Sequence, residues 1–392
     1  MTIKFFYPEE SFSFDVYNKT EDTFSNSNPN NCWTIEWLLK QVNLSYKNVS
    51  TLPKGSCYIK FNIQFPTEYT DLKYLPNSIW DNIRLNDNVF LLLYQATEAI
   101  PFYFWNYRWN KLKEFLQSKK IPPQKVKFIC GDLDATVNHK INVDDYWSYV
   151  DVIGMDIFEL VHNYRHYLDR EPTDIRKTLK SYLKQKTKKK FLCFNRRPRP
   201  NKQSLIFYLK KYNYFDKGLV SNLWEDNDKL ITKEDFEIYN FDGSNYNDLK
   251  FLVPVRNEIQ KGNFVANQSS PGHLYKNTHF SLVSETFTGS KVRLVSEKTY
   301  KPIMMGHPFL IHGTTGTLSY LQSLGYETFQ NIFDETYDLE KKPKKQLELV
   351  IKNLDREFEL TPLTIEKIKH NQNNFLKLNT RHRIKTQLEE FL

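Results

Sequence analysis

The chain has 392 residues, of which 40% are hydrophobic, so it is long enough for two domains that each bury a core. No apolar run approaches the roughly 20 residues that a membrane-spanning helix needs, and acidic residues stand where a secretory signal would have its apolar core. We therefore expect a cytoplasmic protein without a transmembrane segment. The four cysteines lie far apart, which argues against a disulfide framework or a cysteine zinc site. Heavy use of Asn, Lys and Ile suits an AT-rich viral or bacterial genome.

The positive charge is concentrated in one segment. The net charge of the chain is +9, yet residues 176–202 contain twelve basic residues and no acidic one, so the remaining sequence is slightly acidic. Such a block attracts the phosphates of a nucleotide, a nucleic acid or a lipid surface. For its first part a solvated, repulsive linker is the simpler interpretation, and we assign residues 176–190 to a basic linker between two domains.

A first Rossmann-like α/β domain is predicted for residues 1–175. Apolar residues, alternating or continuous, indicate its strands. The predicted strands are 57–63, 88–94, 125–130 and 151–156, and the predicted helices are 102–117 and 158–168. Strands that alternate with helices favour a parallel sheet.

A second Rossmann-like domain is predicted for residues 191–340, and charged helices follow to the end of the chain at 341–392. The stretch 223–275 is polar and has no clear pattern. The predicted strands are 191–194, 218–222, 279–283 and 308–311, and the predicted helices are 204–212, 297–305, 318–324, 346–358 and 363–378. The C-terminal helices could pack back on the first domain or pair two subunits.

The segment 279–313 has the pattern strand, loop, helix, strand. Ser296 is placed to cap a helix that begins at Glu297 and stops at the next glycine, and Glu285 follows the first strand. In open α/β sheets a loop that faces a helix N-terminus is a nucleotide site. A carboxylate such as Glu297 can accept from ribose hydroxyls there, and a cation such as Lys298 can bind a diphosphate. Ordinary helix-end capping is the alternative for both glutamates.

Three arginines lie in the loop after the first strand of the second domain. Asn195 is followed by Arg196, Arg197 and Arg199, with prolines between and after them. Ligands of open sheets bind at the carboxyl ends of strands, and Arg pairs bidentately with phosphate. A departing diphosphate gains negative charge, so fixed cations stabilise it. The alternative is a surface loop held by salt bridges.

The residues Glu285, 295–302, Gly306, Pro308 and Gly313 resemble the donor motif of the α1,3-fucosyltransferases and of the wider GT-B glycosyltransferases. In that family a strand ends in Glu, Thr-Glu-Lys opens a helix, and a Gly and a Pro-led apolar strand follow; here a serine replaces the Thr. The resemblance implies a GT-B fold, in which two Rossmann-like domains face each other across a cleft, with the acceptor on the first domain and the donor on the second.

The same resemblance implies the roles of the site residues. Glu297 would hold the donor ribose, and Lys298 with an arginine of the earlier loop would hold the diphosphate. Thr299 is a further candidate, although a threonine at that position can simply bond back within the helix. The donor would be a GDP- or UDP-sugar, transferred with inversion and without a metal or another cofactor.

An inverting transfer needs a general base, which the family takes from a carboxylate after a strand of the first domain. Glu98 matches best, because it follows the strand at 88–94. Asp132 and Asp134 are rivals, and as an Asp-x-Asp pair they would bind a metal in a GT-A enzyme. We predict no metal site, since the histidines form no ligand pattern, and no P-loop or Gly-x-Gly-x-x-Gly motif occurs.

The sequence therefore predicts a glycosyltransferase that moves a sugar from a nucleoside-diphosphate sugar to a hydroxyl of a glycan or of a modified DNA base. The alternative is a non-enzymatic nucleic-acid-binding protein that uses the basic run 176–202, in which aromatic residues are interleaved.

Overall fold

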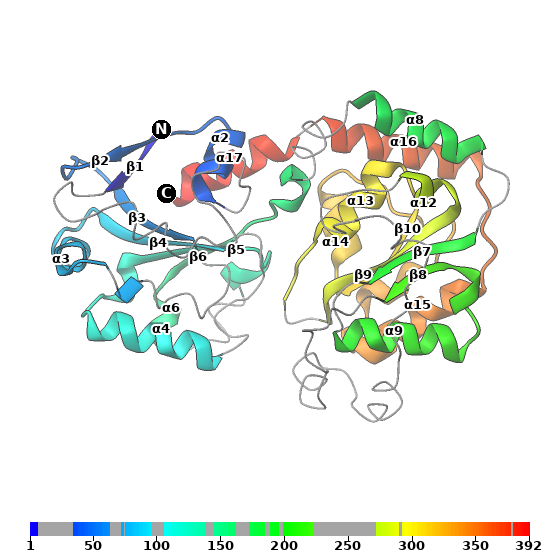
Figure 1. Cartoon of the computed structure of the whole chain (residues 1–392), viewed down its shortest axis with the longest axis horizontal. Coiled ribbons are helices and arrows are strands. Elements are labelled where there is room, and N and C mark those ends of the chain that lie inside the picture. Colours follow the sequence, from blue (N-terminus) through cyan, green and yellow to red (C-terminus); the bar gives the residue numbers. More distant parts are fainter. Residues whose placement is uncertain are drawn as a thin grey trace. The chain divides into compact units, whose positions relative to one another are not determined.

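The computed structural model divides the chain into two compact units (Figure 1). Unit 1 comprises residues 1–160 and 380–392, and unit 2 comprises residues 161–379. The structure describes residues 1–6, 34–62, 72–73, 75–95, 106–137, 145–161, 172–184, 189–195, 199–222, 272–289, 292–377 and 379–392. Within these residues no helix is both long and apolar enough to cross a lipid bilayer.

Unit 1 is built on a six-stranded parallel sheet with the strand order β2-β1-β3-β4-β5-β6. Its strands are β1 Thr2–Phe6, β2 Ser45–Val49, β3 Cys57–Asn62, β4 Val89–Gln95, β5 Val126–Cys130 and β6 Asp151–Gly154. Its helices are α2 Ile35–Gln41, α3 Asn77–Leu85, α4 Asn106–Ser118, η2 Pro123–Lys125, α6 Asp145–Ser148 and α17 Asn379–Phe391. The predicted strands at 57–63, 88–94, 125–130 and 151–156 are all present, whereas β1 and β2 were not predicted.

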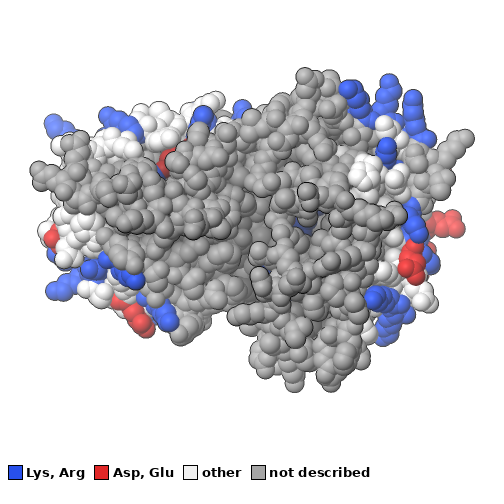
Figure 2. Space-filling view, viewed as in Figure 1, with Lys and Arg blue, Asp and Glu red and all other residues white. Residues whose placement is uncertain are grey.

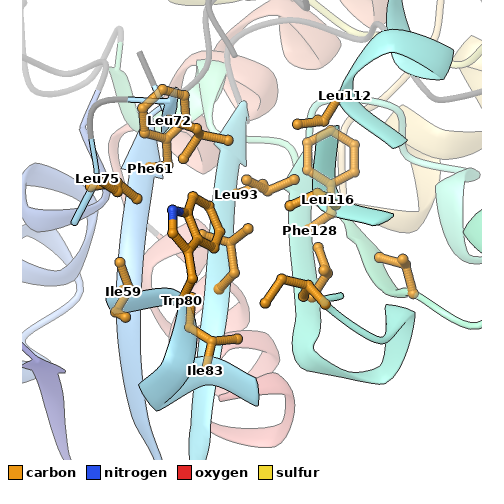
Figure 3. Packing of buried hydrophobic residues seen from close by; sticks show 14 of the residues in the cluster. Ile59, Phe61, Leu72, Leu75, Trp80, Ile83, Leu93, Leu112, Leu116 and Phe128 are labelled. Atoms are coloured by element: carbon orange, nitrogen blue, oxygen red, sulfur yellow. The ribbon is translucent and has the colours of Figure 1, made fainter. Parts of the chain in front are cut away.

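The core of unit 1 lies between its sheet and the helices α3 and α4 (Figure 3). Trp80 of α3 packs edge-on against Phe115 with ring centroids 5.5 Å apart, and Trp109 of α4 packs against Phe128 of β5 at 5.4 Å. Of these four rings Phe115 is partly buried and the other three are buried, and burying a large apolar side chain contributes about 1.5–3 kcal/mol. The central position of β4 explains its continuous apolar sequence, because a parallel strand covered on both faces needs no alternation.

The last helix, α17, belongs to unit 1, whereas the two long helices before it belong to unit 2. Thr380 donates a hydrogen bond to the carboxylate of Glu159, and Arg383 lies 3.7 Å from the same carboxylate. Lys127 of β5 donates to the carbonyl of Phe391 at 2.6 Å. The units thus divide the chain elsewhere than at the expected boundaries of 175, 190 and 340.

Unit 2 is built on a four-stranded parallel sheet with the strand order β10-β9-β7-β8. Its strands are β7 Lys189–Asn195, β8 Leu219–Asn222, β9 Thr278–Gly289 and β10 Phe309–Thr314. Its helices are α8 Pro172–Lys184, α9 Pro200–Lys211, η3 Phe215–Lys217, α12 Gly272–Lys276, α13 Glu297–Met305, α14 Thr317–Ser323, η6 Glu335–Leu339, α15 Pro343–Lys352, η7 Asn353–Asp355 and α16 Pro362–Leu376. In Figure 1, α9 and α15 cover one face of this sheet, and α8, α12, α13 and α16 lie on the other. The predicted α/β class is therefore confirmed, with two parallel sheets flanked by helices.

The order of the strands in unit 2 creates a switch point between β7 and β9. The chain runs from β7 through α9 to β8 on one side, and later returns to place β9 on the other side of β7. From β9 it continues through α13 to β10, on the opposite face from α9. Loops that leave neighbouring strands in opposite directions open a crevice at the carboxyl ends of those strands, and ligands of open α/β sheets bind there.

Three elements of unit 2 differ from their predicted extent. The strand β9 was predicted to span 279–283, but it extends to Gly289, which pairs with Thr314 of β10 after an irregularity in the register. The helix α9 begins at Pro200 rather than four residues later, because proline is well suited to the first helical position. The helix predicted for 346–358 spans Pro343–Lys352, and a 3-10 turn follows it.

Candidate functional site

The switch crevice of unit 2 brings together residues from the two predicted site segments. The end of β7 leads to Arg199 and α9, and the end of β9 carries Glu285 and leads to α13. Glu297, Lys298 and Thr299 form the first turn of α13. The segments are far apart in the sequence, and the parallel pairing of β7 with β9 sets them side by side.

The helix α13 begins and ends as its sequence predicts. Ser296 is the N-cap, and its side-chain oxygen accepts from the backbone N–H of Lys298 at 3.3 Å. Gly306 ends the helix in the left-handed conformation, with φ 66°. The left-handed backbone favours glycine here, and a Cβ would also lie 2.9 Å from Leu179 Cδ1, so that side chain would have to shift. Ser296 and Gly306 therefore set the two ends of α13, so that its first turn lies at the crevice.

Glu285 is completely buried and its carboxylate is bonded within the protein. Oε1 accepts from the backbone N–H of Ser296 at 3.1 Å and from the hydroxyl of Thr299 at 2.6 Å. Oε2 accepts from the hydroxyl of Ser296 at 2.6 Å and from the N–H of Thr286 at 3.2 Å. Glu285 and Thr299 therefore anchor the start of α13 to β9. In this arrangement the Thr299 hydroxyl and the Glu285 carboxylate are hydrogen-bonded to each other.

Lys298 and Glu297 form an ion pair at the start of α13 and remain partly accessible. Lys298 Nζ lies 2.9 Å from Glu297 Oε1, and it donates to the hydroxyls of Ser296 at 3.0 Å and Thr286 at 3.2 Å. Burial lowers the pKa of Lys298, but the carboxylates of Glu297 and Glu285 outweigh burial, so its pKa lies above the ordinary value. Lys298 is therefore a fixed positive charge at physiological pH.

Lys202, in the first turn of α9, is the site residue that sequence reasoning missed. Only 4% of its surface is exposed, and among the described residues it has no hydrogen-bond or ion-pair partner. Burial lowers its pKa well below the ordinary value, and the cations Lys298 and Arg199 lower it further, against the opposing effect of Glu297 and Glu285. The sequence counted Lys202 only as part of the basic run; Pro200, read as the first helical position, would have placed it in a first turn.

Arg199 is the N-cap residue of α9 and makes no side-chain cap. Its guanidinium lies 6.0 Å from the ring centroid of Phe287 on β9, which holds it beside the crevice. Arg196 and Arg197, predicted from the same loop, lie outside the described residues. So does Glu98, the predicted general base.

The carboxylates proposed as a metal pair do not gather ligands in the described residues. Asp132 is fully buried, and its Oδ1 accepts from the backbone N–H of Asp134 at 3.2 Å. Over the described part of the chain, no group of three or more His, Cys, Asp or Glu side chains could hold a metal ion. Among the histidines, His312 is buried in β10, and burial lowers its pKa to about 3.

The comparisons with known proteins give matches in structure only. No protein-family model matches the chain, and no curated protein matches its sequence. Two crystal structures of α1,3-fucosyltransferase match its fold at 10% sequence identity. One, with GDP, covers 96% of this chain and 91% of its own with a TM-score of 0.35. The other covers 97% of this chain and 91% of its own with a TM-score of 0.40.

Proposed function

We propose that the chain is a glycosyltransferase that binds a nucleoside-diphosphate sugar at the switch crevice of unit 2 and transfers the sugar to a hydroxyl acceptor. One observation carries this proposal. Basic side chains from two elements lie close together, Arg199 and Lys202 at the start of α9 and Lys298 at the start of α13, beside the partly accessible carboxylate of Glu297. A diphosphate needs the cations, and the ribose hydroxyls beside it need an acceptor.

The cations would act on the leaving group. As the acceptor oxygen bonds to the anomeric carbon, the bond from that carbon to the phosphate oxygen breaks and its electron pair stays on the diphosphate. Lys298 holds a positive charge in place before the reaction, with Glu297 and two hydroxyls fixing its amine. A charge that is fixed in advance lowers the barrier without reorganisation. Charge compensation by these side chains is the basis for proposing a metal-independent transfer.

The remaining roles extend this proposal to residues that the structure does not describe. Arg196 and Arg197 would add guanidinium groups to the diphosphate, and Glu98 would take the proton of the acceptor hydroxyl. Inversion follows if that base lies on the face of the sugar opposite the diphosphate. The donor would be a GDP- or UDP-sugar that carries a fucosyl or another hexosyl group.

A thermal-shift screen tests the proposal. The panel is GDP, UDP, ADP and CMP with their sugars, each with and without EDTA, because a ligand that binds the native state raises the melting temperature. We expect one diphosphate to raise it, EDTA to leave the shift unchanged, and Lys298→Ala to abolish it. Lys211→Ala is the control, since Lys211 lies in the last turn of α9, at the opposite end of that helix from Arg199 and Lys202. The proposal fails if no nucleotide stabilises the wild-type protein.

An exposed basic face on α8 supports the nucleic-acid-binding alternative. Arg176, Lys177, Lys180 and Lys184 are exposed, whereas Leu179 and Tyr182 of the same helix are buried. Figure 2 shows Lys and Arg side chains at the upper right, where Figure 1 draws α8. Tight DNA binding that weakens steeply with salt and ignores nucleotides would favour this alternative. DNA binding that persists beside a nucleotide shift would instead make DNA a candidate acceptor.

A further inference from the structure

We propose that Lys202 and the first turn of α9 bind the phosphate groups of the donor, and that Lys202 takes up a proton when they bind. The inference rests on the proposed function, because a nucleoside diphosphate is the ligand. It adds a binding residue, and a proton linked to binding, that neither the donor motif nor the arginine loop predicts.

The geometry of α9 provides half of the site. Its N-cap residue, Arg199, makes no side-chain hydrogen bond, and Pro200 at the first helical position has no N–H to satisfy. The backbone N–H groups of Asn201 and Lys202 therefore lie at a helix N-terminus that Arg199, its N-cap residue, does not cap with its side chain. Such a terminus has partial positive charge and free donors, and so favours an anion.

The buried amine of Lys202 provides the other half. Lys367 of α16 shows how unit 2 accommodates a buried lysine for stability alone. Lys367 is 9% exposed, its Nζ donates to the carbonyl of Thr328 at 2.6 Å, and Glu327 lies 3.6 Å away. Lys202 is more deeply buried and has no comparable bond within the described residues. A buried amine without a partner costs stability, so an anion that completes its environment would remove that cost.

The proton uptake follows from the groups that face Lys202. Lys298 on α13 and Arg199 disfavour its charge, Glu297 and Glu285 favour it, and burial disfavours it most. On β7 the nearest titratable group is Cys193, whose pKa burial raises to about 12, so it stays a neutral thiol. On α15, Glu348 faces Tyr208, further along α9. A bound diphosphate adds negative charge beside Lys202, which raises its pKa and draws a proton from solvent.

Titration calorimetry at pH 8 tests both parts of the inference, with inorganic pyrophosphate, GDP and UDP as probes. Each titration is run in two buffers that differ in ionisation enthalpy, because the difference in observed heat counts the protons exchanged. We expect the wild-type protein to take up a proton with each probe that binds. In Lys202→Met we expect binding about tenfold to a hundredfold weaker, as for a lost hydrogen bond to a charged group, and no uptake.

Two further variants separate a ligand from a structural lysine. Lys202→Arg should keep binding but lose the uptake, because a guanidinium is always charged. Lys202→Met should raise the melting temperature of the free protein, whereas Lys367→Met should lower it and leave binding unchanged. If Lys202→Met lowers the melting temperature and binds as the wild type does, Lys202 is structural and the inference is overturned.

The probes also distinguish this failure from failure of the proposed function. Wild-type affinity for GDP or UDP in Lys202→Met overturns the inference and leaves the nucleotide site standing. Pyrophosphate binding that depends on Lys202, without any gain from a nucleoside, supports the phosphate site and contradicts the transferase. If neither pyrophosphate nor a nucleotide binds the wild-type protein, both are wrong.

Discussion

The two sheets of this chain begin with the same strand order but carry different residues at their strand ends. In each, the first strand lies between the second and the third, as β1 does in unit 1 and β7 in unit 2. After β5 and β6 of unit 1 the buried charged residues are acids, Asp132 and Asp156. At the start of α9 in unit 2, the charged residues without an ion-pair partner among the described residues are basic, Arg199 and Lys202. The strand order creates a switch point in both units, and the side chains at the strand ends decide what can bind there.

The two units differ in the sign of these charges and also in whether the charged groups are hydrogen-bonded within the protein. Asp132 accepts from the N–H of Asp134, and Asp156 accepts from the N–H of Phe158, each at 3.2 Å. Glu285 of unit 2 is bonded in the same way to the start of α13. Buried carboxylates thus find donors in the backbone of the following turn, whereas Lys202 finds no such acceptor among the described residues. A ligand stabilises the protein most where it supplies the missing partner of such a buried charged side chain.

The largest effect is expected at Glu285. Glu285→Ala removes the acceptor of three groups on Ser296 and Thr299, and we expect it to destabilise unit 2 by about 3–5 kcal/mol, as for a broken buried charged interaction. Urea unfolding measures the loss. Asp132→Ala is the matched change in unit 1; it removes the acceptor of the Asp134 N–H and should cost about 1–3 kcal/mol.

A different outcome at Glu285 would change the comparison. If Glu285→Ala unfolds at the wild-type urea concentration but no longer binds a nucleotide, then Glu285 is a ligand. The carboxylates of the two strand ends would in that case differ in role, as the family resemblance expected.

Acid should weaken unit 2 more than unit 1. His312 is buried in β10 with its pKa lowered from 6.5 to about 3, so the unfolded state binds the proton first as the pH falls. Its contribution is present above pH 6.5 and is lost toward pH 3, and at pH 5 the loss is about 2 kcal/mol. Hydrogen exchange read by mass spectrometry at pH 7.5 and pH 5, corrected for intrinsic rates, measures each unit separately.

His312→Leu provides the control, because Lys202, with its lowered pKa, contributes with the same sign. The variant should lose most of the difference in acid sensitivity between the units. Equal acid sensitivity of wild type and His312→Leu would show that His312 is not the cause.

The sequence predicted best where one residue type fits one local geometry. Ser296 and Gly306 bound α13 as expected, because an N-cap oxygen and a left-handed glycine are local requirements. The strand β2 was missed because its residues are mostly exposed and show no apolar alternation. The strand β9 is longer than the predicted 279–283 because pairing with β10, a tertiary contact, extends it to Gly289.

The candidate site was predictable in its segments but not in the state of each side chain. Glu297 and Lys298 lie at the crevice where the motif placed them. That Glu285 is bonded to Ser296 and Thr299, and that Lys202 is buried without such bonds, depends on how far two separate turns approach each other. The sequence pattern of either segment alone does not predict the distance between these two turns.

The smallest effects are expected at two matched helix caps. Thr34 caps α2 in unit 1 by accepting from the N–H of Trp37 at 3.2 Å, and Ser296 caps α13 in unit 2. Removing either hydroxyl costs about 1 kcal/mol for the cap. Ser296 also donates to Glu285 and accepts from Lys298 Nζ, so Ser296→Ala should cost about 1 kcal/mol more. Urea unfolding of Thr34→Ala and Ser296→Ala measures both losses.

Nucleotide affinity distinguishes the Thr34→Ala and Ser296→Ala variants in a second way, in addition to their stability. Thr34→Ala should leave nucleotide affinity unchanged, because Thr34 caps a helix of unit 1 and the proposed nucleotide site lies in unit 2. Ser296→Ala should weaken it, because the hydroxyl is one of three oxygens that fix the amine of Lys298. Equal losses of stability and unchanged affinity in both variants would mean that the two caps are equivalent. Lys298 would then be positioned by Glu297 and Thr286 alone, and the electrostatic difference between the two sheet edges would not depend on how α13 is capped.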